Sequence, residues 1–220
     1  MPNALVFDLD GTLVDTAPDL AGALNAVLAA AERKTLEISD VRPLMTQGAV
    51  ALIREGFKIT GAPLDETKLE LARSMFLDHY GTNIAANSKP FPGVPETLET
   101  LATVNTLGVC TNKPEKLSIE LLNALNLSKF FSAIVGGDSL SVRKPDPHHL
   151  WATIEAINAT PAETVMIGDS TNDVETARDA GVPIVAVSYG YRDRPAEMLD
   201  ADIVIDSFSE LPNALNILSH

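Results

Sequence analysis

Short apolar runs alternate along this chain with longer segments in which apolar residues recur every three or four positions. Continuous runs such as Val165–Ile167 and Ile184–Val187 are typical of parallel strands that are covered on both faces. The longer segments predict helices, one of which ends just before Gly181. The predicted strands are Ala4–Phe7, Leu107–Cys110, Ala133–Val135, Thr164–Ile167, Ile184–Val187 and Asp202–Ile205. The predicted helices between them are Val94–Thr103, Pro114–Leu125, Pro147–Ala156 and Asn172–Ala180. This order predicts an α/β fold with a doubly wound parallel sheet.

Residues 16–87 show a different pattern. Their apolar residues recur with helical periodicity, and no run among them clearly predicts a strand. Leu20, Leu24 and Leu28 fall on one helical face. A turn-rich stretch, Asn87–Gly93, then leads back into the α/β pattern. We therefore expect two domains, a core formed by residues 1–15 and 88–220 and a helical insertion formed by residues 16–87.

The composition narrows the class of protein. The 220 residues include 30 Asp and Glu against 16 Lys and Arg, which gives a formal net charge of −14. A field of this sign repels nucleic-acid backbones and anionic lipid surfaces, so we expect no nucleic acid and no membrane as partner. The single cysteine, Cys110, excludes an internal disulfide, and no apolar run approaches the roughly 20 residues of a membrane span. We expect a cytoplasmic protein without a signal peptide.

Acidic residues directly follow the first predicted strand. Asp8 and Asp10 lie two positions apart, just past the carboxyl end of Ala4–Phe7. In open α/β sheets this end faces the crevice in which ligands bind. Gly11 permits a tight turn that keeps the neighbouring backbone amides accessible. Taken alone, the segment also fits an ordinary acidic turn, so its interpretation depends on the other motifs.

Polar residues also follow or precede other predicted elements. Thr111 and Asn112 come directly after Leu107–Cys110 and offer a hydroxyl group and a backbone amide to an anion. A plain helix entry is the alternative for this pair. Lys144 precedes a rigid Pro-Asp-Pro turn, which can hold its ammonium group in a defined place. A solvated loop lysine is the alternative there.

A second acidic pair follows the strand Thr164–Ile167. Asp169 leaves the strand end, and Asp173 lies four residues later, one turn into a helix and on the same side. The alternative is that Asp169 or Ser170 merely caps this helix, with Asp173 as a favourable charge near its start. A parallel sheet gathers all these strand ends at one rim, however. Carboxylates there would hold a hard divalent cation, while the lysine, hydroxyl and amides would hold phosphoryl oxygens. The joint pattern predicts a phosphoryl-transfer site.

Together these motifs resemble the four motifs of the haloacid dehalogenase superfamily. The set consists of Asp8-x-Asp10-Gly-Thr, Thr111-Asn112-Lys113, Lys144-Pro-Asp-Pro and Gly168-Asp169-Ser170-x-x-Asp173, and the resemblance extends from about Leu5 to Arg192. Three further segments, which begin at Phe91, Gly136 and Tyr189, are most similar to phosphoglycolate phosphatases. For those enzymes the resemblance implies a Rossmann-like core with a small all-helical cap domain inserted after the first motif. This agrees with the helical insertion.

The resemblance also implies chemical roles. Asp8 would be the nucleophile, which forms an aspartyl-phosphate, and Asp10 would be the general acid and base. Mg²⁺ would be held by Asp8, by the backbone carbonyl group of Asp10 and by Asp169. The implied activity is that of a magnesium-dependent phosphatase, which acts on a small phosphorylated metabolite through this intermediate. The first candidate substrate is 2-phosphoglycolate.

Four further residues receive supporting roles from the same resemblance. Asp173 would orient metal-bound water and the ammonium group of Lys144. Thr111, Asn112 and Lys144 would bind the phosphoryl oxygens, whose charge changes during the reaction.

Several alternatives remain open at this stage. Another small phosphate, such as a sugar phosphate, fits because Thr46 departs from the Gly-x-Gly that is frequent in the cap segment of phosphoglycolate phosphatases. A sugar phosphomutase is the second alternative, because it also uses both carboxylates. Mutases commonly have valine at the position of Thr12, however, so Thr12 favours hydrolysis. A non-catalytic binding protein with the same fold is the third alternative, and the intact motifs count against it. Arg42 is a candidate partner for a substrate carboxylate, but an Arg before a Pro in a helical segment is more often a solvated surface charge. The chain would act as a monomer or a homodimer.

Three other residues are predicted to be structural. His148 and His149 are neighbours in a helix, so their side chains diverge by about 100° and do not suit one metal ion. Trp151 is predicted to lie in the core.

Overall fold

The computed structural model describes residues 2–191 and 194–218, so Arg192, the last residue of the resemblance, lies outside the described residues. The chain divides into two compact units. The first consists of Met1–Asp15 and Lys89–His220, and the second of Thr16–Ser88. The insertion expected from the sequence, 16–87, ends one residue before the second unit does.

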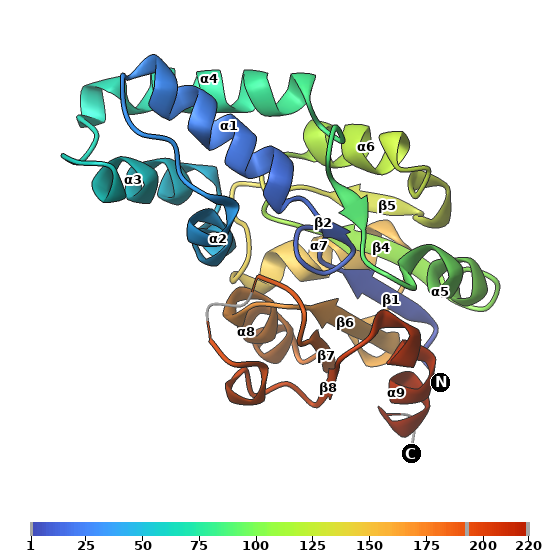
Figure 1. Ribbon diagram of the computed structural model, residues 1–220. Coiled ribbons are helices and arrows are strands. Elements are labelled where there is room, and N and C mark those ends of the chain that lie inside the picture. The colour runs from blue at the N-terminus through green and yellow to red at the C-terminus, as the bar shows by residue number, and fades with distance from the viewer. Residues whose placement is uncertain (1, 192–193, 219–220) are drawn as a thin grey trace. The chain divides into compact units, whose positions relative to one another are not determined.

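The first unit is built around a parallel sheet (Figure 1). Within the described residues, six strands pair in the order β5-β4-β1-β6-β7-β8, and all these pairings are parallel. β1 is central, with Val6 opposite both Gly108 of β4 and Met166 of β6. The strands are β1 (Ala4–Phe7), β4 (Thr106–Cys110), β5 (Ala133–Val135), β6 (Thr164–Gly168), β7 (Ile184–Val187) and β8 (Ile203–Ile205). The predicted fold class is confirmed.

Helices cover both faces of this sheet, because successive side chains of a strand point to opposite sides. Val6 belongs to an apolar cluster on one face, which includes Leu150 and Val174. The side chain of Phe7 packs on the other face, where its ring centroid lies 6.0 Å from that of Phe208. The helices of this unit are α5 (Val94–Leu101), α6 (Glu115–Ala124), α7 (Pro147–Ala156), α8 (Thr171–Ala180) and α9 (Leu211–Leu218).

The second unit is helical, as its periodicity predicts. Helix α1 packs against both α3 and α4, and Leu24 and Leu28 of α1 are fully buried. Gly56 allows a close approach of α3 to α1, because a Cβ atom at Gly56 would lie 2.8 Å from a methyl carbon of Leu24. The helices are α1 (Ala17–Ala30), α2 (Ile38–Val41), α3 (Ala49–Ile59) and α4 (Glu66–Thr82), with a 3₁₀ helix at Arg42–Gln47.

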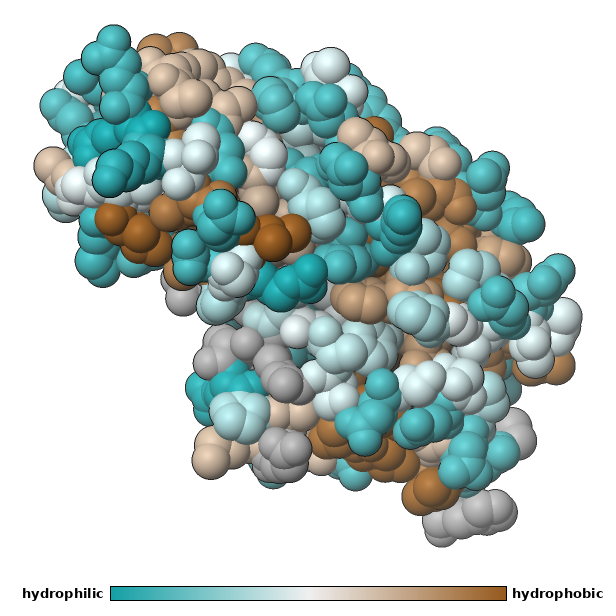
Figure 2. Space-filling model, in the orientation of Figure 1, coloured by the Kyte–Doolittle hydropathy of each residue, from teal (hydrophilic) through white to brown (hydrophobic). Residues whose placement is uncertain are grey.

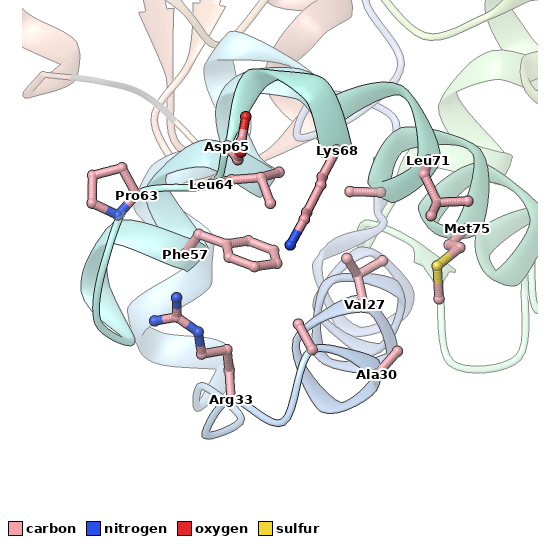
Figure 3. A pocket seen from close by; sticks show the side chains of 12 residues that line it. Val27, Ala30, Arg33, Phe57, Pro63, Leu64, Asp65, Lys68, Leu71 and Met75 are labelled. Atoms are coloured by element: carbon pink, nitrogen blue, oxygen red, sulfur yellow. The ribbon is translucent and has the colours of Figure 1, made fainter.

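A cavity of about 420 Å³ opens within the second unit (Figure 3). Phe57, Leu71 and Met75 contribute apolar surface to it, and the side chain of Lys68 extends toward the ring of Phe57. The described residues that line the cavity include none of the predicted site residues. The cavity is therefore not the predicted phosphoryl-transfer site.

The face of the molecule that is drawn in space-filling form (Figure 2) is mostly polar. Figure 2 shows a mainly hydrophilic face with scattered hydrophobic residues, and the large hydrophobic side chains that are most exposed, such as Val104 and Met198, lie far apart in the sequence. None of the described helices combines the length and the apolar character that crossing a membrane requires.

Two features differ from the sequence-based expectation. A short antiparallel pair, β2 (Val14–Asp15) with β3 (Lys89–Pro90), forms where the chain leaves and re-enters the first unit. The prediction that Trp151 lies in the core is wrong, because 38% of this residue is exposed. Its indole Nε1 donates a hydrogen bond to the Ala180 carbonyl oxygen at 3.2 Å, so Trp151 lies over the end of α8.

Candidate active site

Loops at the carboxyl ends of the strands bring residues of all four motifs together. The ammonium nitrogen of Lys144 lies 2.8 Å from Oδ1 of Asp8 and 2.6 Å from Oδ1 of Asp173. The amide Nδ2 of Asn112 donates a hydrogen bond to the Lys144 carbonyl oxygen at 2.9 Å. Asp8, Asp169 and Asp173 each place a carboxylate oxygen within 4.8 Å of the others. All of these residues belong to the first unit.

Asp8 lies at the end of the central strand with only 8% of its surface exposed. Its backbone N–H donates to the Ile167 carbonyl oxygen at 2.9 Å and so continues the β1–β6 pairing. Burial raises the pKa of Asp8 to about 7, with Lys144 acting against the rise and Asp173 adding to it. An additional cation beside Asp8 would therefore favour its ionised form.

Lys144 is buried and held from two directions. Burial opposes its charge, but the carboxylates of Asp173 and Asp8 outweigh this effect and raise the pKa of Lys144 above its ordinary value. Its backbone N–H donates to Nδ1 of His149 at 3.2 Å, and Nε2 of His149 lies 3.0 Å from the Gly136 carbonyl oxygen. Burial lowers the pKa of His149 to about 4, so a neutral imidazole with its proton on Nε2 fits both contacts. The alternative of a solvated loop lysine is wrong.

Asp169 is fixed by hydrogen bonds to both of its carboxylate oxygens. The hydroxyl group of Thr12 donates to Oδ1 at 2.9 Å, and the backbone N–H of Tyr191 donates to Oδ2 at 2.6 Å. Gly11 has φ +90°, and a Cβ atom at Gly11 would lie 2.4 Å from Oδ2 of Asp169. The turn at Gly11 therefore serves this close approach. Burial raises the pKa of Asp169, and the charges of Asp173 and Asp8 add to the rise.

The two carboxylate oxygens of Asp173 contact different groups. Its Oδ2 accepts hydrogen bonds from the backbone N–H groups of Asp169 and Ser170 at 3.1 and 3.0 Å, and from the Ser170 hydroxyl group at 2.7 Å. Ser170 caps α8 in a reciprocal capping box with Asp173. The other oxygen of Asp173 contacts Lys144. The helix-start interpretation and the positioning of Lys144 thus both hold, with Ser170 as the cap.

The loop after β4 is not a simple helix entry. Helix α6 starts after Pro114, which occupies its N-cap position. Thr111 is buried, and its Oγ1 accepts a hydrogen bond from the Lys113 N–H at 3.2 Å. Oδ1 of Asn112 is buried and has no hydrogen-bond partner among the residues that the structure describes.

Asp10 contacts a residue that the sequence motifs left unassigned. The ammonium nitrogen of Lys113 lies 2.8 and 3.0 Å from the two carboxylate oxygens of Asp10, and only 7% of Lys113 is exposed. Lys113 belongs to the Thr-Asn-Lys motif, so its place two residues after Thr111 could have indicated that it lies in the site. The sequence motifs also did not predict the contacts of Thr12 and of the Tyr191 backbone with Asp169. A backbone N–H can come from almost any residue type, so the sequence does not indicate which one donates.

The donor set fits a hard divalent cation. Carboxylate oxygens are the preferred protein ligands of Mg²⁺, and three of them converge at this site. Burial is the main cause of the raised pKa values of Asp8 and Asp169, so a cation beside them would favour their ionised forms. Cys110 does not join this chemistry, because burial raises the pKa of its thiol to about 12. The cluster can therefore hold a metal ion.

Comparisons with known proteins agree with this geometry. Residues 5–187 match the sequence model of a family described as haloacid dehalogenase-like hydrolase. The phosphoglycolate phosphatase of Caulobacter vibrioides is 49% identical over 211 residues, which cover 96% of this chain and 89% of that protein. The phosphoglycolate phosphatase of Agrobacterium fabrum is 42% identical, with 96% and 91% covered. The crystal structure of a predicted phosphoglycolate phosphatase from Haemophilus somnus superposes with a TM-score of 0.90 at 31% identity, and 97% of each chain is covered.

Proposed function

The chain belongs to the haloacid dehalogenase-like hydrolase family, and on that premise we propose that it is a magnesium-dependent phosphatase whose substrate is 2-phosphoglycolate. Relatives that are 49% and 42% identical over nearly the whole chain are phosphoglycolate phosphatases. The observation that carries the proposal is Lys144, which bridges Asp8 and Asp173 beside Asp169. This arrangement supports the proposal that a nucleophilic carboxylate and a fixed cation act together on a phosphoryl group.

The first chemical step belongs to Asp8. Its carboxylate attacks phosphorus and forms an aspartyl-phosphate, while the bond from phosphorus to the leaving-group oxygen breaks. Asp10 gives a proton to that oxygen, so glycolate leaves as a neutral alcohol at its hydroxyl end. Asp10 then takes a proton from the water that attacks the aspartyl-phosphate, and this second displacement releases phosphate and regenerates Asp8.

Other residues hold the phosphoryl group during both displacements. Lys144, the hydroxyl group of Thr111 and the loop at Asn112 are proposed to bind its peripheral oxygens. The fixed contacts of Lys144 with Asp173 and of its backbone with His149 limit the motion of the ammonium group. This preorganisation lowers the cost of orienting the cation during the reaction.

A magnesium ion would be held by the carboxylates of Asp8 and Asp169 and by the backbone carbonyl group of Asp10. One oxygen of Asp173 contacts Lys144, and the other accepts hydrogen bonds from three donors. These contacts support the proposal that Asp173 positions Lys144 and metal-bound water. When bound, the ion would neutralise charge on the carboxylates and the phosphoryl group.

The helical unit Thr16–Ser88 is proposed to be the cap domain that the resemblance implies, and the protein is proposed to work in the cytoplasm. Arg42 lies at the start of the 3₁₀ helix of this unit. Arg42 therefore remains a candidate partner for a substrate carboxylate.

The test is hydrolysis of a panel of small phosphate monoesters with Mg²⁺ and with excess EDTA. We expect the highest kcat/KM for 2-phosphoglycolate and loss of hydrolysis in EDTA. Asp8→Asn should lower kcat by far more than tenfold and leave the fold intact, because the amide has nearly the same shape and is not nucleophilic. Full activity in EDTA would contradict the metal assignment. An Asp8→Asn enzyme that keeps more than about a tenth of kcat, a loss under about 1.4 kcal/mol, would exclude Asp8 as the nucleophile.

A further inference from the structure

Two lysines are buried among the described residues, and each one contacts a different catalytic carboxylate. Lys144 contacts Asp8, the proposed nucleophile, at 2.8 Å. Lys113 contacts both carboxylate oxygens of Asp10, the proposed acid and base, at 2.8 and 3.0 Å. The nucleophile side of the site receives the phosphoryl group, whereas the side of the acid faces the leaving-group oxygen. Lys113 therefore marks the leaving-group side.

We propose that Lys113 binds the carboxylate group of the leaving group and thereby selects phosphate monoesters of short hydroxy acids. This inference rests on the proposed function, because it uses Asp10 as the group that protonates the leaving-group oxygen. It names the residue of the catalytic unit that distinguishes 2-phosphoglycolate from uncharged phosphate esters.

The dimensions of the substrate fit this assignment. In 2-phosphoglycolate a single carbon separates the leaving-group oxygen from the carboxylate, so the carboxylate oxygens lie only about 3 Å from that oxygen. A leaving-group oxygen that accepts a proton from Asp10 lies about 2.7 Å from it. Because Lys113 is itself within hydrogen-bond distance of Asp10, its ammonium group and the substrate carboxylate would both lie next to the Asp10 carboxyl group.

The chain already shows an ammonium group that serves two carboxylates. Lys144 bridges Asp8 and Asp173 at 2.8 and 2.6 Å. By analogy, Lys113 is proposed to contact a substrate carboxylate as well as Asp10 when substrate is bound.

The position of Lys113 is fixed by its own backbone. Its N–H donates to the Thr111 hydroxyl oxygen at 3.2 Å, and its carbonyl oxygen accepts from the Gly137 N–H at 2.8 Å. A Cβ atom at Gly137 would lie 2.4 Å from the Asn112 carbonyl oxygen, so the two loops are in close contact there. A buried cation that is held this firmly beside the acid suits recognition of an anion better than a mobile surface lysine does.

The experiment compares two substrates of nearly the same shape, 2-phosphoglycolate and its neutral amide. The measured quantity is the ratio of kcat/KM for the acid to kcat/KM for the amide, in which effects of Lys113 that are equal for both substrates cancel. Lys113→Met should lower this ratio about 10- to 100-fold, the range of a hydrogen bond to a charged group. Lys113→Arg should retain most of the ratio, because the guanidinium group keeps the charge.

Two further variants complete the design. Lys116→Met is the matched control, since the Lys116 side chain is 86% exposed, and its ratio should equal that of the wild type. Lys113→Gln takes the place of Lys113→Met if the methionine variant does not fold, and the same loss of the ratio is expected.

The possible results separate the inference from the proposed function. Equal losses on the acid and the amide would overturn the inference, because Lys113 would then act only on Asp10 or on the fold. A loss of the ratio in Arg42→Met and not in Lys113→Met would overturn it as well and assign the carboxylate to Arg42. A wild type that is inactive on both compounds would overturn the proposed function and the inference with it.

Discussion

Replacement of Lys144 by methionine should destabilise the protein strongly, because it removes the buried cation between Asp8 and Asp173. Both contacts are short, at 2.8 and 2.6 Å, and only 4% of Lys144 is exposed. Removal of one partner from a buried ion pair costs about 3–5 kcal/mol. This is a large part of the 5–15 kcal/mol that is typical of the free energy of unfolding of a whole domain.

The loss should shrink as the pH falls. Burial already raises the pKa of Asp8 from 3.8 to about 7 while Lys144 acts against the rise, so the pKa should be higher still without Lys144. A carboxyl group whose pKa is raised in the folded state makes the protein less stable as the pH rises through that pKa. Below the pKa of the same group in the unfolded chain, it causes no such loss. The variant should therefore regain stability between about pH 8 and about pH 5, as Asp8 takes up a proton.

Urea denaturation in EDTA at these two pH values measures both effects. Lys116→Met is the control, because the side chain of Lys116 is 86% exposed and its change should stay within about 0.5 kcal/mol. A Lys144→Met protein as stable as the wild type at the higher pH would refute the reasoning. So would a loss of the same size at both pH values, because the cost would then not come from ionised carboxylates.

Two more predictions follow from the same site. With an aryl phosphate as substrate, Asp10→Asn should accumulate one phosphoryl group on the enzyme, because this leaving group needs little protonation while the attack by water lacks its base. Intact mass measured after a rapid quench should show the added group. Its appearance on Asp8→Asn instead would reverse the two roles. Because burial lowers the pKa of His149 to about 4, the stability this histidine contributes is complete above pH 6.5 and is lost toward pH 4. Between these values the wild type should lose about 2–3 kcal/mol relative to His149→Gln in urea denaturation, and parallel pH profiles of the two proteins would contradict the burial of a neutral imidazole.

The sheet was predictable because its strands are buried on both faces. Ala4–Phe7 is a continuous apolar run with 1% exposure or less at every residue, so its pattern left no competing assignment. The strands Val14–Asp15 and Lys89–Pro90 were missed for the opposite reason. Each is two residues long, and one contains a proline, so only the long-range pairing makes them strands.

The clustering of the carboxylates of Asp8, Asp169 and Asp173 could be predicted because a parallel sheet places every strand end at one rim. Their partners could not be predicted in the same way. The contact of Lys113 with Asp10 joins two loops that are 103 residues apart in the chain. Trp151 was misassigned because hydrophobic character alone does not say on which side of α7 a residue lies. Leu150 and Ile154 of that helix are buried, and the tryptophan lies outside their face.

The acidic composition and an anionic substrate are compatible because the cations of the site are buried. Among the residues that the structure describes, Lys113 and Lys144 are the buried lysines of a chain with a net charge of −14. In a low-dielectric interior a charge acts strongly over a few ångströms, whereas surface charges farther than about 10 Å are screened by salt. The two lysines therefore determine the local field at Asp8 and Asp10, while the acidic surface repels large polyanions. A small phosphate monoester that reaches the rim therefore meets this local field.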